Sequence, residues 1–111
     1  MWHQLDYLKY GFEMLRPDEE GDLEIVQCSL QIEPYQIVIE GPDNTIHTFD
    51  DILQVEPNRV DIGNEYLVAY YDGFYIQIKI EPGDGLVLDM WANNDDVSSP
   101  ISEEAIWWDE L

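Results

Sequence analysis

Positive charge is what this sequence has least of. Lysine and arginine together number 4 against 25 aspartates and glutamates, and the formal net charge of the 111 residues is -21 at pH 7. Direct nucleic-acid binding needs lysines and arginines that neutralise phosphates, so the deficit argues against it, and equally against binding to anionic membrane surfaces. The class of partner that complements such a chain is a basic protein.

Groups suited to catalysis or metal binding are also scarce. The sequence has 2 histidines and 1 cysteine, Cys28, so no internal disulfide can form and a reducing compartment is expected. Cys28 lies in an alternating apolar segment, which favours a small buried side chain over a nucleophile. No Cys-x-x-Cys or His-Glu-x-x-His zinc pattern is present, and the acidic runs do not fit the spacing of an EF-hand loop. We therefore predict no enzyme activity, no cofactor and no metal.

Long apolar runs are missing as well. No run approaches the roughly eighteen apolar residues that span a bilayer, and the N-terminus lacks the basic and apolar regions of a signal peptide. These features predict a cytoplasmic protein. Hydrophobic residues nevertheless make up 45% and aromatic residues 13%, which is enough to build a core. We expect one domain covering residues 1–111.

The N-terminal segment, Trp2 to Leu15, predicts a helix. Its apolar residues follow the spacing of one helical face, although a glycine interrupts the pattern: Leu5, Leu8, Phe12 and Leu15. The segment after the next loop, Leu23 to Ile32, alternates as a strand does. A change of face between Ile25 and Val26 predicts a β-bulge there.

Further strands follow in the middle of the chain. Tyr35 to Ile39 alternates, and two shorter strands are expected at Thr45 to Phe49 and Ile52 to Glu56. The strongest pattern lies between Tyr66 and Trp91, where an Asp72-Gly73 hairpin turn and a second turn at Glu81 to Gly85 predict a three-stranded meander.

The C-terminal segment predicts a short helix. Ser99 is a suitable cap, Pro100 suits the first helical position, and Ile101, Ala105 and Trp108 share one helical face. The fold class expected from all segments is α+β, with an N-terminal helix, an antiparallel sheet of about five or six strands arranged as a meander, and a short C-terminal helix.

Acidic residues without matching cations are the candidates for partner binding. Two adjacent tryptophans among acids near the C-terminus resemble an interface hot spot, because tryptophan is enriched in such spots. The alternative without a binding role is that the acids are simply solvated and one tryptophan is part of the core. The candidates are Asp18, Glu19, Glu20, Asp22, Asp50, Asp51, Asp95, Asp96, Glu103, Glu104, Trp107, Trp108, Asp109 and Glu110.

These observations predict an acidic inhibitor that binds and blocks a basic, nucleic-acid-handling protein such as a nuclease. Such an inhibitor is either a DNA mimic, as in a phage anti-defence protein, or an immunity protein against a nuclease toxin. Solubility alone requires only about 2–8 net charges, and adaptation to high salt is disfavoured by the many large aromatic side chains. The alternative is a non-catalytic structural or adaptor subunit of a larger assembly. The oligomeric state is left open.

Overall fold

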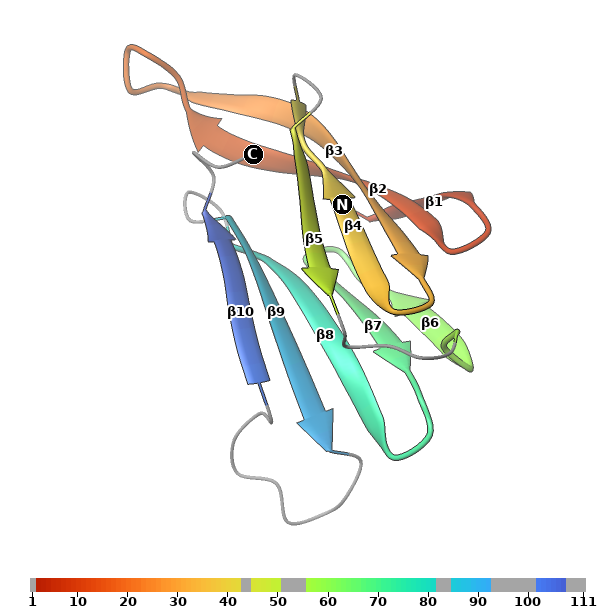
Figure 1. Cartoon of the computed structure of the whole chain (residues 1–111). Coiled ribbons are helices and arrows are strands. Elements are labelled where there is room, and N and C mark those ends of the chain that lie inside the picture. The colour runs from red at the N-terminus through yellow and green to blue at the C-terminus, as the bar shows by residue number, and fades with distance from the viewer. Residues whose placement is uncertain (1, 43–44, 51–55, 82–84, 93–101, 108–111) are drawn as a thin grey trace.

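The computed structural model describes residues 2–42, 45–50, 56–81, 85–92 and 102–107. These residues form ten strands in two five-stranded sheets (Figure 1). The first sheet contains β1 (His3–Asp6), β2 (Lys9–Pro17), β3 (Leu23–Glu33), β4 (Gln36–Glu40) and β5 (Ile46–Asp50). The second contains β6 (Arg59–Ile62), β7 (Tyr66–Tyr70), β8 (Phe74–Glu81), β9 (Gly85–Ala92) and β10 (Ser102–Trp107).

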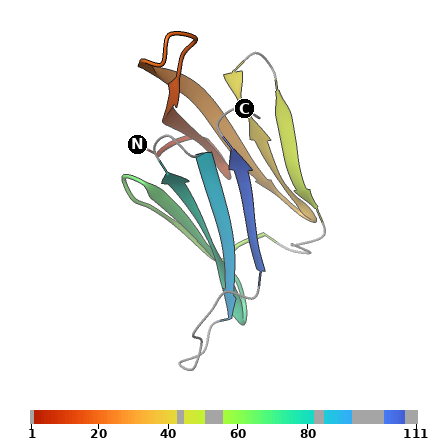
Figure 2. The ribbon, with the colours of Figure 1, turned by 90° about the vertical axis from the view of Figure 1, so that its left-hand side faces the viewer.

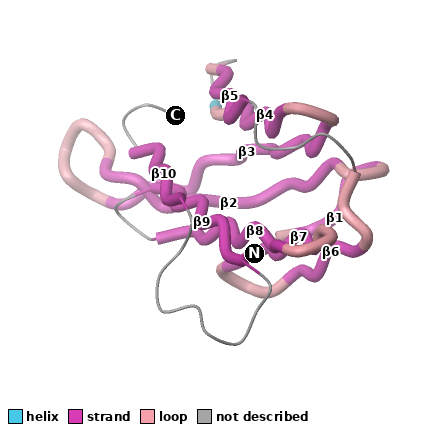
Figure 3. The backbone as a smooth tube through the Cα atoms, turned by 60° about the horizontal axis from the view of Figure 1, so that its bottom comes forward, coloured by secondary structure: helices cyan, strands magenta, loops and turns pink. Residues whose placement is uncertain are grey.

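Each sheet is an antiparallel meander. The strand order is β1-β2-β3-β4-β5 in the first sheet and β10-β9-β8-β7-β6 in the second, so within each sheet every strand pairs with its neighbours along the chain. Figure 2 shows the two sheets as two layers, and Figure 3 shows that the described backbone is almost entirely strand and loop.

One hydrophobic core joins the two layers. Alternate residues of the inner strands point between the sheets, and they form a single cluster of buried side chains. The cluster includes the aromatic rings of Trp2 and Phe12, whose centroids lie 4.4 Å apart. The largest side chains with almost no exposure are Phe12, Met14, Leu30, Ile32, Ile37, Ile39, Leu67, Ile76, Ile78, Leu86 and Leu88.

The prediction of an α+β fold is wrong, since the described residues contain no α-helix and the strands outnumber the expected five or six. The N-terminal segment forms the β1–β2 hairpin, with Leu8 in the turn at φ 54°. Leu5 and Leu15 of the predicted helical face are exposed, while Tyr10, Phe12 and Met14 alternate into the core. Here strand pairing and core burial override the helical spacing.

The predicted C-terminal helix is also wrong where it can be compared. Residues 102–107 form β10, which pairs with β9 from Ser102 opposite Met90 to Trp107 opposite Gly85. As a strand, this segment buries the Ile106 side chain against the core. Its backbone also pairs with the edge of β9, which would otherwise have unpaired N–H and C=O groups. The proposed cap at Ser99 and Pro100 lies outside the described residues.

The predicted bulge between Ile25 and Val26 is wrong too, because β2 and β3 keep one register from Lys9 opposite Gln31 to Pro17 opposite Leu23. Val26 points to the core and Ile25 points away from it. The meander between Tyr66 and Trp91 is confirmed as β7, β8 and β9. Of the shorter strands, Thr45 to Phe49 corresponds to β5, and most of Ile52 to Glu56 lies outside the described residues.

Candidate protein-binding surface

Four predicted site residues come together at the turn between β2 and β3. This turn, which we name the acidic tip, contains Asp18, Glu19, Glu20 and Asp22. The β2–β3 hairpin is long, and Figure 1 shows its tip extending beyond the second sheet. The acidic tip is therefore presented to solvent on a projecting element.

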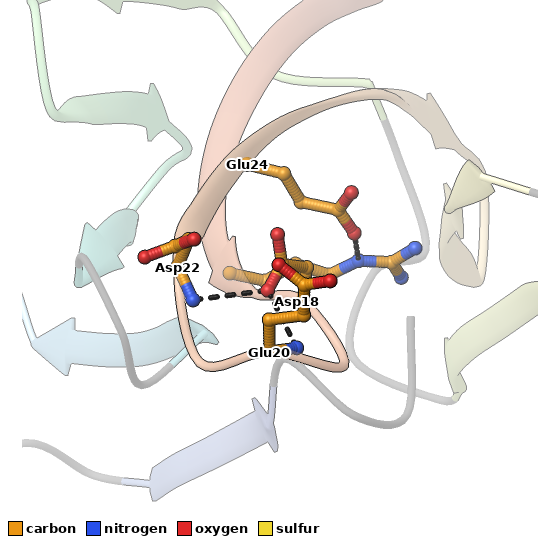
Figure 4. A network of polar contacts seen from close by, with 5 residues as sticks. Asp18, Glu20, Asp22 and Glu24 are labelled. Atoms are coloured by element: carbon orange, nitrogen blue, oxygen red, sulfur yellow. Dashed lines mark hydrogen bonds and ion pairs between the residues drawn. The ribbon is translucent and has the colours of Figure 1, made fainter.

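Asp18 holds the shape of the acidic tip (Figure 4). Its Oδ1 accepts hydrogen bonds from the backbone N–H groups of Glu20 and Asp22, both at 2.9 Å. Its own N–H donates to the Asp22 carbonyl at 2.7 Å. Side-chain caps of this kind fix a turn without help from regular pairing. Asp18 is thus structural, and its three acidic neighbours form the part that a partner can reach.

The remaining acids of the tip are open to solvent. Glu19, Glu20 and Asp22 are exposed, and none of them forms an ion pair with another described residue. At the base of the tip, Arg16 Nε donates to Glu24 Oε1 at 2.9 Å, which joins β2 to β3. The nearby cation is therefore already engaged with a different carboxylate.

An apolar surface that the sequence interpretation missed lies next to the acidic tip. We name it the apolar flank: Leu15, Leu23 and Ile25, which are 36%, 60% and 67% exposed. Leu15 lies opposite Ile25 in the β2–β3 register, and Leu23 lies opposite Pro17. The sequence signal for this surface was the run of apolar residues on both faces of β3, which was interpreted as a bulge.

A groove of about 430 Å³ runs beside the apolar flank. Met14, Leu15, Ile25 and Ile80 supply apolar lining, while Glu13 and Glu65 place carboxylates on its wall. Because Ile80 and Glu65 belong to the second sheet's half of the chain, the groove lies between the hairpin and that sheet.

The predicted residues of β10 lie elsewhere, on the second sheet. Glu103 and Trp107 share its outer face, whereas Glu104 lies opposite Leu88 in the register and belongs to the inner-face row. All three are exposed, Trp107 by 54%. Trp107 and Glu103 line a hollow of about 310 Å³ together with Lys79 and Asp89.

Asp89 is a carboxyl that the sequence interpretation did not single out. It lies directly opposite Glu103. Burial raises its pKa, and the charge of Glu103 and a side-chain hydrogen bond with Glu103 raise it further, while Lys79 acts in the opposite direction. Its Oδ1 is buried and has no conventional donor in the described structure. Burial of this oxygen without a donor disfavours the charged form of the carboxyl, which agrees with the raised pKa.

The other predicted site residues do not join either surface. Asp50 ends β5 in the first sheet, where its backbone lies opposite Gln36. Asp51, Asp95, Asp96, Trp108, Asp109 and Glu110 lie outside the described residues. The predicted set is thus divided among the acidic tip, β5 and β10.

A row of aromatic side chains crosses the outer face of the second sheet. The Arg59 guanidinium carbon lies 4.4 Å from the ring centroid of Tyr70, which is 6.0 Å from that of Tyr75. Tyr75 in turn stacks on Trp91 with centroids 6.4 Å apart. Cross-strand contacts of this kind stabilise a sheet without any partner. Tyr75 lies directly opposite Tyr70 in the β7–β8 register.

Two findings concern reactive groups. Cys28 is buried, as predicted, and burial raises the pKa of its thiol to about 11. Among the described residues, no three histidine, cysteine, aspartate or glutamate side chains gather closely enough to hold a metal ion.

The described part of the chain contains no helix with the length and apolar character needed to cross a membrane. Comparisons with family models, with curated proteins and with solved structures find no match to this chain.

Proposed function

We propose that this chain is a non-catalytic, acidic inhibitor that binds a basic, nucleic-acid-handling protein and blocks its nucleic-acid site. A cytoplasmic location, inferred from the sequence, is part of the proposal. The net charge of -21 supports it, because charge of one sign speeds the encounter with an oppositely charged partner.

The acidic tip is the observation that carries the proposal. Asp18 fixes the loop backbone, so Glu19, Glu20 and Asp22 are held together before any partner arrives. A pre-ordered surface loses less conformational entropy on binding than a mobile one. A projecting, fixed group of carboxylates suits the basic groove that a nucleic-acid enzyme offers to phosphates.

Two forms of this function differ in the target. A DNA mimic competes with nucleic acid and is displaced by it, whereas an immunity protein binds one nuclease toxin through additional apolar anchors. Competition with DNA separates them, because the anchored complex resists displacement.

The experiment is capture followed by inhibition. The tagged chain is incubated with a lysate of the source organism, and retained proteins are identified after washes at low and raised salt. Each retained basic protein is then purified, and its nucleic-acid binding or cleavage is measured with increasing amounts of the chain. A variant with Glu19→Gln, Glu20→Gln and Asp22→Asn is the matched control.

We expect inhibition by the native chain and much weaker inhibition by the control variant. Retention of no basic protein at moderate salt contradicts the proposal. Retention without inhibition contradicts the blocking role and leaves only binding.

The alternative, a structural or adaptor subunit, is favoured by the apolar flank, because exposed apolar patches mark assembly surfaces. Sedimentation of the purified chain distinguishes the two. A strict monomer that inhibits an enzyme excludes a self-assembling subunit, and an oligomer without inhibition supports one.

A further inference from the structure

The apolar flank is unusual because of where it lies. Leu23 and Ile25 are more than half exposed, yet they lie immediately beside the most acidic turn of the hairpin. The register places Val26 in the core and Leu23 and Ile25 on the opposite face, so core packing does not require an apolar residue at either outward position. A polar side chain at a solvent-facing strand position is compatible with the fold. An exposed leucine and an exposed isoleucine on the same strand face therefore indicate a contact surface.

The groove beside the flank combines two chemistries. Met14 and Ile80 are buried and line its apolar part, and Leu15 and Ile25 extend that lining to solvent. Glu65 is exposed, and with Glu13 it places carboxylates on the groove wall. A ligand that fits both parts has an apolar stem and a positively charged end.

Lysine and arginine side chains have this form. Their methylene stems lie along apolar surfaces while the charged end stays among polar groups or water. We propose that the groove beside the apolar flank receives a lysine or arginine side chain of the basic partner, with the stem on Leu15 and Ile25 and the cation near Glu65. The inference rests on the proposed function and names the part of the surface that anchors the partner.

Charge decides between a basic partner and a second copy of this chain. Each copy carries a net charge of -21, and pairing of two flanks brings two acidic tips into proximity. Such repulsion opposes self-association, whereas the same charges attract a cationic partner. The basic partner is therefore the occupant that the surroundings of the groove favour.

The test measures the contribution of the stem separately from that of the charge. Two labelled peptides of equal length and charge are titrated into the full chain at low salt and pH 6.5. One carries lysines spaced by glycines, and the other carries diaminobutyric acid, whose ammonium group sits on a shorter stem. Fluorescence anisotropy gives both dissociation constants.

We expect the lysine peptide to bind about tenfold more tightly than the short-stem peptide, because burial of two further methylenes accounts for about that ratio. The variant Leu15→Thr/Ile25→Thr removes apolar area without changing charge or strand preference, and should reduce the ratio to about one. The matched control is Ile46→Thr on β5, a residue 64% exposed and outside the groove, which should keep the ratio. Thermal unfolding of each variant confirms that it is folded.

The outcomes separate the two proposals. Equal binding of both peptides to the native chain, or an unchanged ratio in the flank variant, overturns the groove assignment while the inhibitor function stands. Binding of neither peptide also overturns the groove assignment, and the proposed function is then decided by the capture and inhibition experiment alone. A dimer in sedimentation that Leu15→Thr/Ile25→Thr dissociates overturns the assignment in favour of a second copy.

Discussion

Asp89 on β9 lies directly opposite Glu103 on β10, so two carboxyl groups face each other across neighbouring strands. Like charges in this arrangement destabilise a sheet. Burial and the charge of Glu103 raise the pKa of Asp89, so the folded state binds its proton more tightly than the unfolded state does. The stability from this proton is complete below the ordinary pKa of aspartate and is lost as pH rises through the raised value.

Asp89→Asn should therefore raise the melting temperature at neutral pH. The free energy of unfolding should rise by about 0.2–1 kcal/mol, the usual size of a cross-strand pair effect. This increase should disappear at pH values below the ordinary pKa of aspartate. Calorimetric scans at several pH values give this dependence. Glu104→Gln, on β10 beside Glu103 but in the inner-face row, is the control for simple loss of charge. A gain of equal size in both variants would assign the effect to net charge alone.

The second prediction concerns the cap of the acidic tip. Asp18→Ala removes the acceptor of two backbone N–H groups and should lower the free energy of unfolding by about 1 kcal/mol. Asp18→Asn keeps a side-chain oxygen and should lose less. Urea unfolding measures both variants, and Glu19→Ala is the control on the same loop. Faster hydrogen exchange at Glu20 and Asp22 only in Asp18→Ala locates the change.

Salt should stabilise this protein through its net charge. The molecule extends 45 × 31 × 23 Å, and charges across it interact at about 10 mM ionic strength, where the screening length is about 30 Å. At about 150 mM the length falls to about 8 Å, so self-repulsion weakens and the melting temperature should rise by several degrees. Sodium and potassium chloride should act alike. A melting temperature that falls with salt would show that attractive charge pairs dominate instead.

The fourth prediction compares two glycines with positive φ. Gly73 has φ +85° and nothing within 4 Å of an added Cβ, so Gly73→Ala should cost only the backbone strain, about 1–2 kcal/mol. Gly85 has φ +134°, and an added Cβ meets the Ile106 carbonyl oxygen. Gly85→Ala should therefore cost clearly more and loosen β10 from β9. Denaturant unfolding gives the two values, and equal losses would contradict the close approach of Ile106.

The meander of the second sheet was predictable because its turn chemistry and its alternation agree. Asp72-Gly73 favours a tight hairpin, and Ile76, Ile78 and Ile80 mark one face without ambiguity. The β1–β2 hairpin was not predictable in this way. Its turn places Leu8 at positive φ, a conformation that leucine rarely adopts. The sequence therefore has no glycine or asparagine at this position to indicate a turn.

The candidate site was predictable in part. Consecutive acids with a glycine identified the loop of the acidic tip, but the capping role of Asp18 depends on hydrogen bonds that no spacing reveals. The groove needed the second sheet, since Glu65 and Ile80 lie far along the chain from Ile25. Apolar residues on both faces of β3 were visible in the sequence. Because the register of β3 is continuous, they form an exposed apolar surface and do not mark a bulge.

The strictly sequential order of both sheets also has a consequence for how the chain folds. Among the ten described strands, every hydrogen-bonded pair joins consecutive strands, so each ladder closes over a short stretch of chain and loses little loop entropy. Distant parts of the sequence need to meet only when one layer docks on the other. Refolding should accordingly be faster than is usual for two-layer β proteins whose ladders join distant strands, with each layer growing hairpin by hairpin before the layers meet.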